Sequence, residues 1–248
     1  MAEKVVLYEV KDKVAYIILN RPDKRNVLNR ASCAELREAW LSLDRDPEVR
    51  VGIITGAGNA FCAGQDLGAE LDSTAVDSII PNNGIYIAKP LIAAINGWAA
   101  GAGLALCANC DIRVASEEAR FVFPEVKVGT SKGGIELLNF MDTTTAVEMM
   151  LTGEPINAQR AYQAGFLNRV VPAESLMKEA ERFADILKRN APLTMKMLKA
   201  YIFEHKKTLM QSWNMMYDMY IRPQEESTDV MEGIAAFKEK RVPKFRGE

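Results

Sequence analysis

The stretch from Pro90 to Gly129 constrains the fold of this chain more than any other part of the sequence. It begins with an apolar run typical of a strand, Leu91–Ile95, which ends at an Asn-Gly pair. The glycine turn at 101–103 then leads, without any polar residue, into a second apolar run at 104–108. That run is too apolar for a surface helix, so the pattern predicts a buried strand followed by a glycine turn and a buried helix.

A single carboxylate follows this buried unit. The segment Phe121–Phe123 is apolar, and Pro124 then places Glu125 beside it. Burying a lone carboxylate costs on the order of several kcal/mol unless the group is paired or used. We therefore take Glu125 as the first candidate for chemistry.

Composition excludes several classes of function. The chain has 248 residues, of which 48% are hydrophobic and 26% charged, so it can bury a sizeable core. Its net charge of −2 gives no overall attraction to nucleic acid or to a membrane, and we expect neither as a partner. No apolar run approaches the roughly 20 residues that span a bilayer, and the N-terminus does not resemble a signal peptide. We expect a cytoplasmic protein, or one of an organelle matrix after removal of a leader.

The cysteines and the histidine predict no metal site. Cys33, Cys62, Cys107 and Cys110 do not form a disulfide framework in a chain of this size. The last two have the spacing of a zinc or redox pair, but no second pair exists and the only histidine, His205, is far away in the sequence. We interpret both as small core residues. A Ser-His-Asp or Cys-His mechanism would have to use His205, which lies in a charged helical stretch that we expect to be solvated.

Strands and helices alternate along most of the chain. Strands are expected at 14–19, 49–55, 91–95 and 166–171, and helices after Asn29, at 143–150 and between Asn157 and Gly165. Residues 68–88 carry mixed charge, and we expect a helical or loop insertion near the surface. The alternation indicates an α/β fold with largely parallel strands.

The chain becomes almost wholly helical after Ala173. Four apolar residues there would share one helical face: Leu176, Ala180, Phe183 and Leu187. Pro192 suits the first turn of a long helix, Pro223 would end it, and a last helix is expected over 227–240. Methionines and aromatic residues are frequent between 195 and 220, which is more typical of a core or a subunit interface than of a cofactor site.

Six segments, in order along the chain, resemble the crotonase superfamily, which includes enoyl-CoA hydratases and isomerases. They are NRPDKRNVLN at 20–29, GAGNAFCAGQDL at 56–67, PLIAAINGWAAGAG at 90–103, FVFPEVKVG at 121–129, AVEMMLTG at 146–153 and EKRVPKFRGE at 239–248. The resemblance implies an α/β spiral of repeated strand-strand-helix units over residues 1–190, which would hold the CoA and acyl site. It also implies a C-terminal all-helical region, 191–248, that forms homotrimers or dimers of trimers. The substrate would be an acyl-CoA thioester, with no cofactor beyond its CoA moiety.

The resemblance also implies an oxyanion hole. In this family two backbone N–H groups hold the thioester oxygen, one after the glycine of the FxAGxD motif and one at the centre of the G-x-G turn. Here these residues are Gln65 and Ala102. Removing a proton next to a thioester creates an enolate, and two fixed N–H donors stabilise the charge that develops on its oxygen.

The CoA end of the site is implied by two further segments. Family members place the turn after the first strand and the FxAGxD segment around the adenosine and phosphates of CoA. The corresponding residues are Lys24, Arg25, Asn26, Val27, Ala63, Asp66 and Leu67. Lys24 and Arg25 can pair with phosphate charge. In the family, residues equivalent to Lys244 and Phe245 often reach the CoA of a neighbouring subunit.

One catalytic position departs from the hydratase pattern. Hydratases of the family use two glutamates to hold and activate a water, and this chain has Glu125 for the second but Ala105 for the first. Enoyl-CoA isomerases of the Δ3,Δ2 type are similar to this chain in keeping only the Glu125 equivalent. One carboxylate can move a proton from C2 to C4 more easily than it can both fix a water and supply a proton. We therefore predict an isomerase-like enzyme with Glu125 as its only base.

Two alternatives stay open. The sequence after Gly129 also departs from typical hydratases, in a region that borders the acyl pocket of the family. Four polar residues there could contact an unusual acyl group: Lys127, Lys132, Glu136 and Asp142. Glu136 is the one that could restore a second acid, and with it a hydratase or dehydratase mechanism.

The other alternative is a non-catalytic CoA-binding homologue. The oxyanion-hole motifs and Glu125 both count against it.

Overall fold

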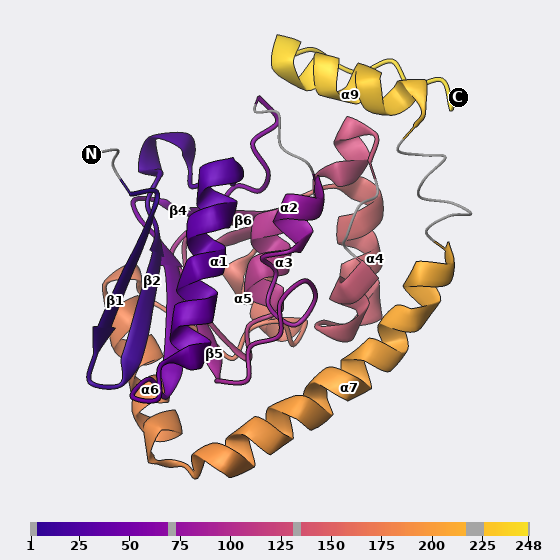
Figure 1. Cartoon of the computed structure of the whole chain (residues 1–248). Helices are drawn as coiled ribbons and strands as arrows, with labels where there is room; N and C mark the ends of the chain where they lie inside the picture. Colours follow the sequence, from indigo (N-terminus) through magenta and orange to yellow (C-terminus); the bar gives the residue numbers. More distant parts are fainter. Residues whose placement is uncertain (1–3, 69–72, 131–134, 217–225, 248) are drawn as a thin grey trace.

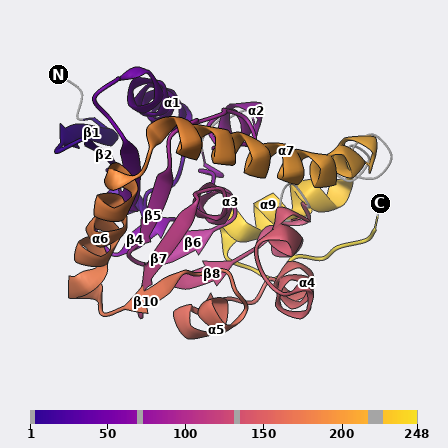
Figure 2. The same cartoon turned by 90° about the horizontal axis from the view of Figure 1, so that it is seen from below.

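The computed structural model of the chain describes residues 4–68, 73–130, 135–216 and 226–247 (Figure 1). Within these ranges, side chains are described for all residues except 73–74, 135–136 and 206–216. The chain folds into two sheets with helices packed around them, and the long helix α7 (Pro192–Met216) runs along the outside in both views (Figures 1 and 2). Among the described helices, none combines the length and the apolar character required of a membrane span.

The larger sheet has six strands in the order β1-β2-β3-β5-β7-β10. Its members are β1 (Val6–Lys11), β2 (Val14–Leu19), β3 (Val51–Gly56), β5 (Leu91–Ile95), β7 (Ile112–Ser116) and β10 (Arg169–Val171). Only β1 runs antiparallel to its neighbour. The central strand β5 is buried at every position, as its continuous apolar sequence requires in a parallel sheet covered on both faces.

The smaller sheet has four short strands, β4 (Ala60–Cys62), β6 (Trp98–Ala100), β8 (Arg120–Val122) and β9 (Ile156–Asn157). Each of the first three follows a strand of the larger sheet through a short connection, so that β3 leads to β4, β5 to β6 and β7 to β8. Helices α2 (Ser73–Asp77) and α3 (Ala102–Ala108) then follow β4 and β6. This repeated strand-strand-helix unit confirms the spiral that the sequence predicts.

Two amphipathic helices bury the larger sheet. Helix α1 (Arg30–Arg45) begins at Asn29, whose side chain accepts the N–H of Ser32 as an N-cap. Its Leu36, Trp40 and Leu43 are fully buried, as expected from their spacing. Helix α6 (Leu176–Arg189) packs on β3, β5 and β7 through the predicted apolar face, which forms a second core cluster with these strands.

The remaining helices are shorter or lie in the loops between these elements. They are α4 (Thr143–Thr152), α5 (Ala158–Gln163) and α9 (Thr228–Glu239), together with the 3₁₀ turns η1 (Pro22–Lys24), η2 (Glu125–Val128), η3 (Ile135–Asn139) and η4 (Ala173–Ser175). Asn157 caps α5, as predicted, by accepting the N–H of Arg160. The predicted stop at Pro223 lies outside the described residues. The division of the chain at residue 190 stays a prediction.

Three expectations from the sequence were wrong in detail. The strands β1, β6, β7 and β9 were not foreseen, and β6 and β9 have only three and two residues. The strand expected over 166–171 is confined to Arg169–Val171. The insertion expected near the surface at 68–88 instead buries Ile79, Ile80 and Ile87 in the main core, and the carbonyl of Ile79 accepts a hydrogen bond from Trp40 Nε1.

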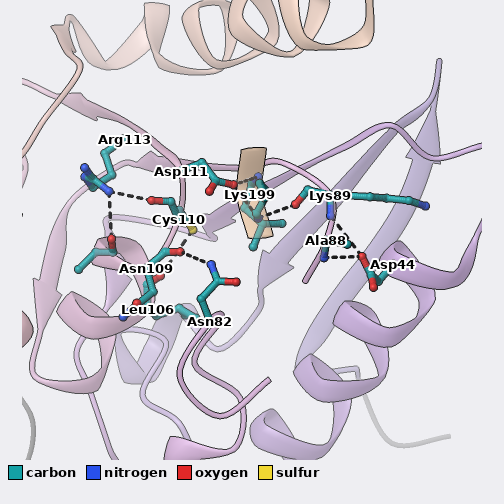
Figure 3. A network of polar contacts seen from close by, with 12 residues as sticks. Asp44, Asn82, Ala88, Lys89, Leu106, Asn109, Cys110, Asp111, Arg113 and Lys199 are labelled. Atoms are coloured by element: carbon teal, nitrogen blue, oxygen red, sulfur yellow. Dashed lines mark hydrogen bonds and ion pairs between the residues drawn. The ribbon is translucent and has the colours of Figure 1, made fainter. Parts of the chain in front are cut away.

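The four cysteines are free and buried, and the prediction that Cys107 and Cys110 are small core residues is confirmed. Burial raises the pKa of Cys62 to about 12 and that of Cys107 well above the usual value of a thiol, so both stay protonated near neutral pH. The buried guanidinium of Arg113 lies beside the end of α3, where it donates to the carbonyls of Ala108 and Cys110 (Figure 3). These residues therefore stabilise the core, and the reactive thiolate form is suppressed.

Helix α7 is tied to the core by one buried lysine. Lys199 is 6% exposed, and its Nζ lies 2.7 Å from the carbonyl oxygen of Lys89 and 2.8 Å from Asp111 Oδ2 (Figure 3). The same carboxylate oxygen accepts the N–H of Leu91 at the start of β5. Lys199 thus joins the C-terminal helix to the central strand of the larger sheet.

Replacing Lys199 should destabilise the fold. Lys199→Met keeps the aliphatic stem but leaves Asp111 without its cation, and removing one partner of a buried ion pair costs about 3 kcal/mol. Urea unfolding followed by circular dichroism measures the loss. Lys196→Met, at an exposed position of the same helix, is the matched control and should change the free energy of unfolding by less than about 0.5 kcal/mol. Equal stability of the two variants would contradict the role given to Lys199.

Candidate functional site

One cleft, with a volume of about 1130 Å³, brings together segments that are far apart in the sequence. Its walls come from the turn after β2, the bend after β4, the region of α2, the start of α3, the turn η2 and helix α9. The lining residues fall within 24–27, 63–68, 76–83, 101–105, 123–130 and 230–243, with Leu137 in addition. The stretch from Pro90 to Gly129 therefore supplies the inner wall.

Glu125 stands at the start of η2, directly after β8 and Pro124. Its carbonyl oxygen accepts the N–H groups of Gly129 and Thr130, which closes the turn. Its Oε2 atom is buried, and a Cβ built on Gly101 would lie only 2.6 Å from Oε1. The carboxylate is therefore packed against the backbone of the glycine turn that precedes α3.

The amide of Ala102 lies at this same turn. Gly101 has φ +51 and is the N-cap of α3, so no side chain there can accept the N–H groups of the first helical turn. The N–H of Gly101 donates to Val122 O, which fixes the turn to β8. The N–H of Ala102 belongs to the first turn of α3, where the amides have no intrahelical acceptor, and it is carried next to the carboxylate of Glu125.

The orientation of the Gln65 amide follows from its neighbours. Leu28 donates its N–H to Gly64 O and accepts the N–H of Asp66, which is a parallel pairing with Gln65. In such a pairing both bonds of Leu28 go to the residues flanking Gln65, so the N–H of Gln65 points to the opposite side. Gly64, with φ +94, lies so close to the turn before α3 that a Cβ would be 3.6 Å from the nitrogen of Ala102. The two predicted oxyanion donors thus lie on adjacent backbone segments, and their role stays a prediction.

Ala105 lies one helical turn after Ala102 and also lines the cleft. Its carbonyl accepts both the backbone N–H and the side-chain amide of Asn109, which closes the end of α3. Asn109 in turn accepts a hydrogen bond from Asn82 (Figure 3). The position at which the family pattern puts a glutamate therefore presents a methyl group to the cleft.

Six of the residues predicted to bind CoA line the cleft: Lys24, Arg25, Val27, Ala63, Asp66 and Leu67. Lys24 and Arg25 are exposed at its rim. The carboxylate of Asp66 would repel phosphate, but it lies 3.4 Å from the guanidinium of Arg21 and accepts the N–H of Gly68. Its charge is thereby partly compensated.

Asn26 does not belong to this set. It is 2% exposed, and its side chain donates to the carbonyls of Ala57 and Ala60 and accepts the N–H of Arg21. These three bonds hold the turn after β2 against the connection between β3 and β4. The side chain therefore shapes the turn that presents Lys24 and Arg25.

The wall formed by α9 was not foreseen from the sequence. Val230, Ile234 and Phe237 lie on the cleft side of this helix, and Lys238 and Arg241 follow them. The spacing of the three apolar residues is the signal that could have found this wall, since it places them on one helical face. The predicted Lys244 and Phe245 are not among the cleft-lining residues of the described chain, and their contact with a neighbouring subunit stays a prediction.

The four polar residues that the sequence suggests near the acyl group differ in their surroundings. Lys127 lines the cleft, but its ammonium pairs with Glu154 at 2.7 Å. Asp142 is the N-cap of α4, where it accepts the N–H of Thr145, and this bond lowers the pKa of its carboxyl group. Lys132 and the side chain of Glu136 lie outside the described residues. Asp142 is not among the described residues that line the cleft, and a contact of any of the four with the acyl group stays a prediction.

No metal-binding constellation is found in the described ranges. Within them, no three His, Cys, Asp or Glu side chains gather in a way that could hold an ion. His205 is exposed on α7, as the sequence suggested.

Comparison with known proteins identifies the family. The family model described as "Enoyl-CoA hydratase/isomerase" matches residues 9–248. The chain belongs to the enoyl-CoA hydratase/isomerase family. The predicted membership of the crotonase superfamily is thereby confirmed, and the protein is an acyl-CoA enzyme of that family.

Similar proteins cover the whole chain. An (E)-benzylidenesuccinyl-CoA hydratase of Thauera aromatica is 35% identical over 98% of this chain and 99% of its own length. A 2,3-dehydroadipyl-CoA hydratase of Escherichia coli K12 is 34% identical over 100% of both chains. The crystal structure of a carnitinyl-CoA hydratase from Mycobacterium avium superposes with a TM-score of 0.89, at 32% identity and over 100% of both chains. These relatives of the family are named as hydratases, which favours the hydratase alternative over the isomerase-like prediction.

The contact between Gly101 and Glu125 predicts the effect of one added methyl group. Gly101→Ala would place a Cβ 2.6 Å from Glu125 Oε1 at a residue with φ +51, so the carboxylate has to move. A displacement of about 1 Å costs roughly 100-fold in rate. The assay is the exchange of the α-protons of butyryl-CoA for deuterium in D₂O, followed by NMR.

The matched control for this variant is Gly165→Ala. Gly165 also has positive φ, +81, but no atom lies within 4 Å of the place that its Cβ would take. Gly165→Ala therefore introduces backbone strain at a positive φ without a close contact of the added Cβ. If both variants exchange α-protons at the same rate, the carboxylate does not depend on Gly101.

Proposed function

We propose that this protein is an acyl-CoA hydratase or dehydratase in which Glu125 transfers the proton at the α-carbon of the thioester. The observation that carries this proposal is the packing of the Glu125 carboxylate against Gly101, next to the first amide of α3. In the proposal, the carboxylate is the base and the neighbouring amide of Ala102 is a donor for the thioester oxygen. The water-adding reaction is supported by the similarity to relatives named as hydratases.

The thioester oxygen is held by the amides of Gln65 and Ala102. Both are backbone donors on adjacent segments of the cleft wall, and backbone donors of this kind do not reorganise during the reaction. Loss of one such donor typically costs about 10²- to 10³-fold in rate. Negative charge that develops on the oxygen is stabilised there while bonds change at the α- and β-carbons.

In the proposed hydration, Glu125 moves one proton from water to the substrate in two steps. The Glu125 carboxylate takes a proton from a water as the hydroxide oxygen bonds to the β-carbon, and the π electrons of the enoyl group move to form the enolate. The carboxylic acid next delivers that proton to the α-carbon, and the carboxylate is restored. Dehydration is the same sequence in reverse, so one glutamate suffices for the balance of protons.

CoA binds along the outer part of the cleft. The phosphates lie near Lys24 and Arg25, where charge-assisted hydrogen bonds can form. Val27, Ala63 and Leu67 pack against the adenosine. No cofactor beyond the CoA moiety of the substrate is required.

An isomerase is the second candidate, and Ala105 is the observation that favours it. A methyl group at this position cannot hold the attacking water, so the single base would be better suited to moving a proton from C2 to C4 of a 3-enoyl-CoA. The proton taken from C2 is the one returned to C4, and the double bond shifts without any change in composition. A side chain of Glu136 directed into the cleft would instead supply the second acid of a hydratase.

We also propose that the chain forms a homotrimer or a dimer of trimers. Large apolar side chains of α7 are exposed in the single chain, among them Leu193, Leu198, Tyr201 and Ile202. Exposed apolar patches of this kind are typical of protein interfaces. A second copy of the chain is the partner that the family resemblance implies.

The test of the proposed reaction is Glu125→Gln. The amide cannot accept a proton, so α-proton exchange and turnover of crotonyl-CoA should be lost, while the shape of the cleft is kept. Affinity for CoA, measured by calorimetry, should stay within about threefold of the wild type because the phosphate end is untouched. Turnover that survives this substitution would remove Glu125 from the mechanism.

A second variant separates the two reactions. Ala105→Glu supplies the carboxylate that the family pattern has at this position, so hydration of crotonyl-CoA should rise by about tenfold or more. The same change should slow the isomerisation of 3-hexenoyl-CoA, because it fills space beside the acyl chain. Ala105→Gln, which has the same size without the charge, is the control. If the wild type shifts the double bond of 3-hexenoyl-CoA but hydrates neither substrate, the isomerase is the correct assignment.

A further inference from the structure

Helix α9 approaches the turn that carries Glu125 backbone to backbone at two glycines. A Cβ built on Gly233 would lie 2.3 Å from the carbonyl oxygen of Val128 and 2.4 Å from its carbonyl carbon. From the other side, a Cβ on Gly129 would lie 2.7 Å from the carbonyl oxygen of Asp229. Contacts this short involve rigid backbone atoms, so α9 can take this position only because both residues are glycines.

The same turn holds the catalytic carboxylate. Val128 ends η2 and Gly129 is its left-handed C-cap, with φ +75. The N–H groups of Gly129 and Thr130 both donate to the carbonyl oxygen of Glu125. A shift of Val128 or Gly129 is thus transmitted through this hydrogen-bonded turn to the residue at its start.

Helix α9 and the C-terminal tail form one unit. Asp229, at the start of the helix, accepts the N–H groups of Arg246 and Gly247 at 2.7 and 2.8 Å. Glu232 forms an ion pair with Arg241 and accepts the N–H of Lys244, and these two interactions lower the pKa of Glu232 to about 2. The tail therefore folds back onto α9 and stabilises this helix where it contacts η2.

The contact between α9 and η2 lies at the substrate cleft, because Val128 and Gly233 are themselves among its lining residues. Val230, Ile234 and Phe237 of α9 line the cleft that Glu125 also lines. One helix therefore forms part of the substrate wall and at the same time bears on the turn of the base. A bound acyl-CoA that contacts α9 would stabilise the position from which α9 holds the turn.

We propose that Gly129 and Gly233 are positioning residues, through which α9 of the same chain sets the position of the Glu125 carboxylate. This inference rests on the proposed role of Glu125 as the base. It assigns to the last helix a function in the chemical step and not only in enclosing the substrate. The contact is made by backbone atoms, so no side chain can adapt to relieve an added Cβ.

The first test is Gly233→Ala. Alanine favours a helix more than glycine does, so the substitution does not weaken α9 itself and acts through the contact with Val128. The rate of α-proton exchange at saturating butyryl-CoA should fall by about 10- to 100-fold. The backbone amides of residues 125–130 should also exchange faster in hydrogen–deuterium exchange mass spectrometry. Met231→Ala is the control in the same helix, since Met231 is 75% exposed, and it should change neither readout.

Gly129→Ala tests the contact from the other side. It should give the same two effects, and Gly165→Ala is its control for strain at a positive φ without a neighbouring atom. If one of the variants Gly233→Ala and Gly129→Ala fails to fold, the other still tests the inference. Unfolding midpoints of all four variants separate a loss of stability from a loss of position.

Three results would overturn the inference or redirect it. If only the apparent KM rises and the saturating rate is unchanged, α9 is a wall of the cleft and does not position Glu125. If neither changes, α9 does not press on the turn in solution. If the wild type itself exchanges no α-protons, the proposed function fails, and the amide exchange of residues 125–130 alone decides whether α9 holds the turn.

Discussion

Close approach of backbone to backbone at glycine residues is the constraint on which the cleft depends. Gly103 packs α3 so tightly on β4 that a Cβ would lie 2.1 Å from the carbonyl oxygen of Cys62. Gly64 brings the bend after β4 against Ala100 in the same way, with 2.9 Å to its carbonyl oxygen. Because packed backbone segments cannot adapt as side chains do, the groups carried by these turns keep fixed places. This packing sets the backbone positions of the amides and of the carboxylate around Gly101.

Such an arrangement suits chemistry in which charge moves onto an oxygen. Fixed donors stabilise an enolate without reorganising, whereas water or mobile side chains would have to turn toward it. The chain has a net charge of only −2, so its overall field does not attract the phosphates of CoA. In the proposed function, the attraction would come from Lys24, Arg25 and Lys238, which line the same cleft as Glu125.

The sequence predicts those features that have a local cause. The N-caps at Asn29 and Asn157 and the buried face of α6 follow from the residues within each segment, and all three are confirmed. The walls of the cleft could not be predicted in this way, because α9 and the turn after β2 are far apart in the sequence and line one cleft only in the folded chain. The sequence of 228–239 shows which face of α9 is apolar, but it does not show what that face covers. Asn26 illustrates the same limit, since its three buried hydrogen bonds go to residues that only the fold brings near.

The methyl group of Ala105 bears on which reaction this site supports. Dehydration and double-bond isomerisation both begin with removal of an α-proton and formation of an enolate, and the two reactions differ only afterwards. The arrangement of Glu125 and the turn before α3 suits this shared step. The fate of the enolate depends on the group that occupies the space beside Ala105: a water or a leaving hydroxyl gives a hydratase, and the C4 carbon of the substrate gives an isomerase. In the proposed function, the choice between them would therefore be made by the acyl chain and by the group beside Ala105, and not by the base itself.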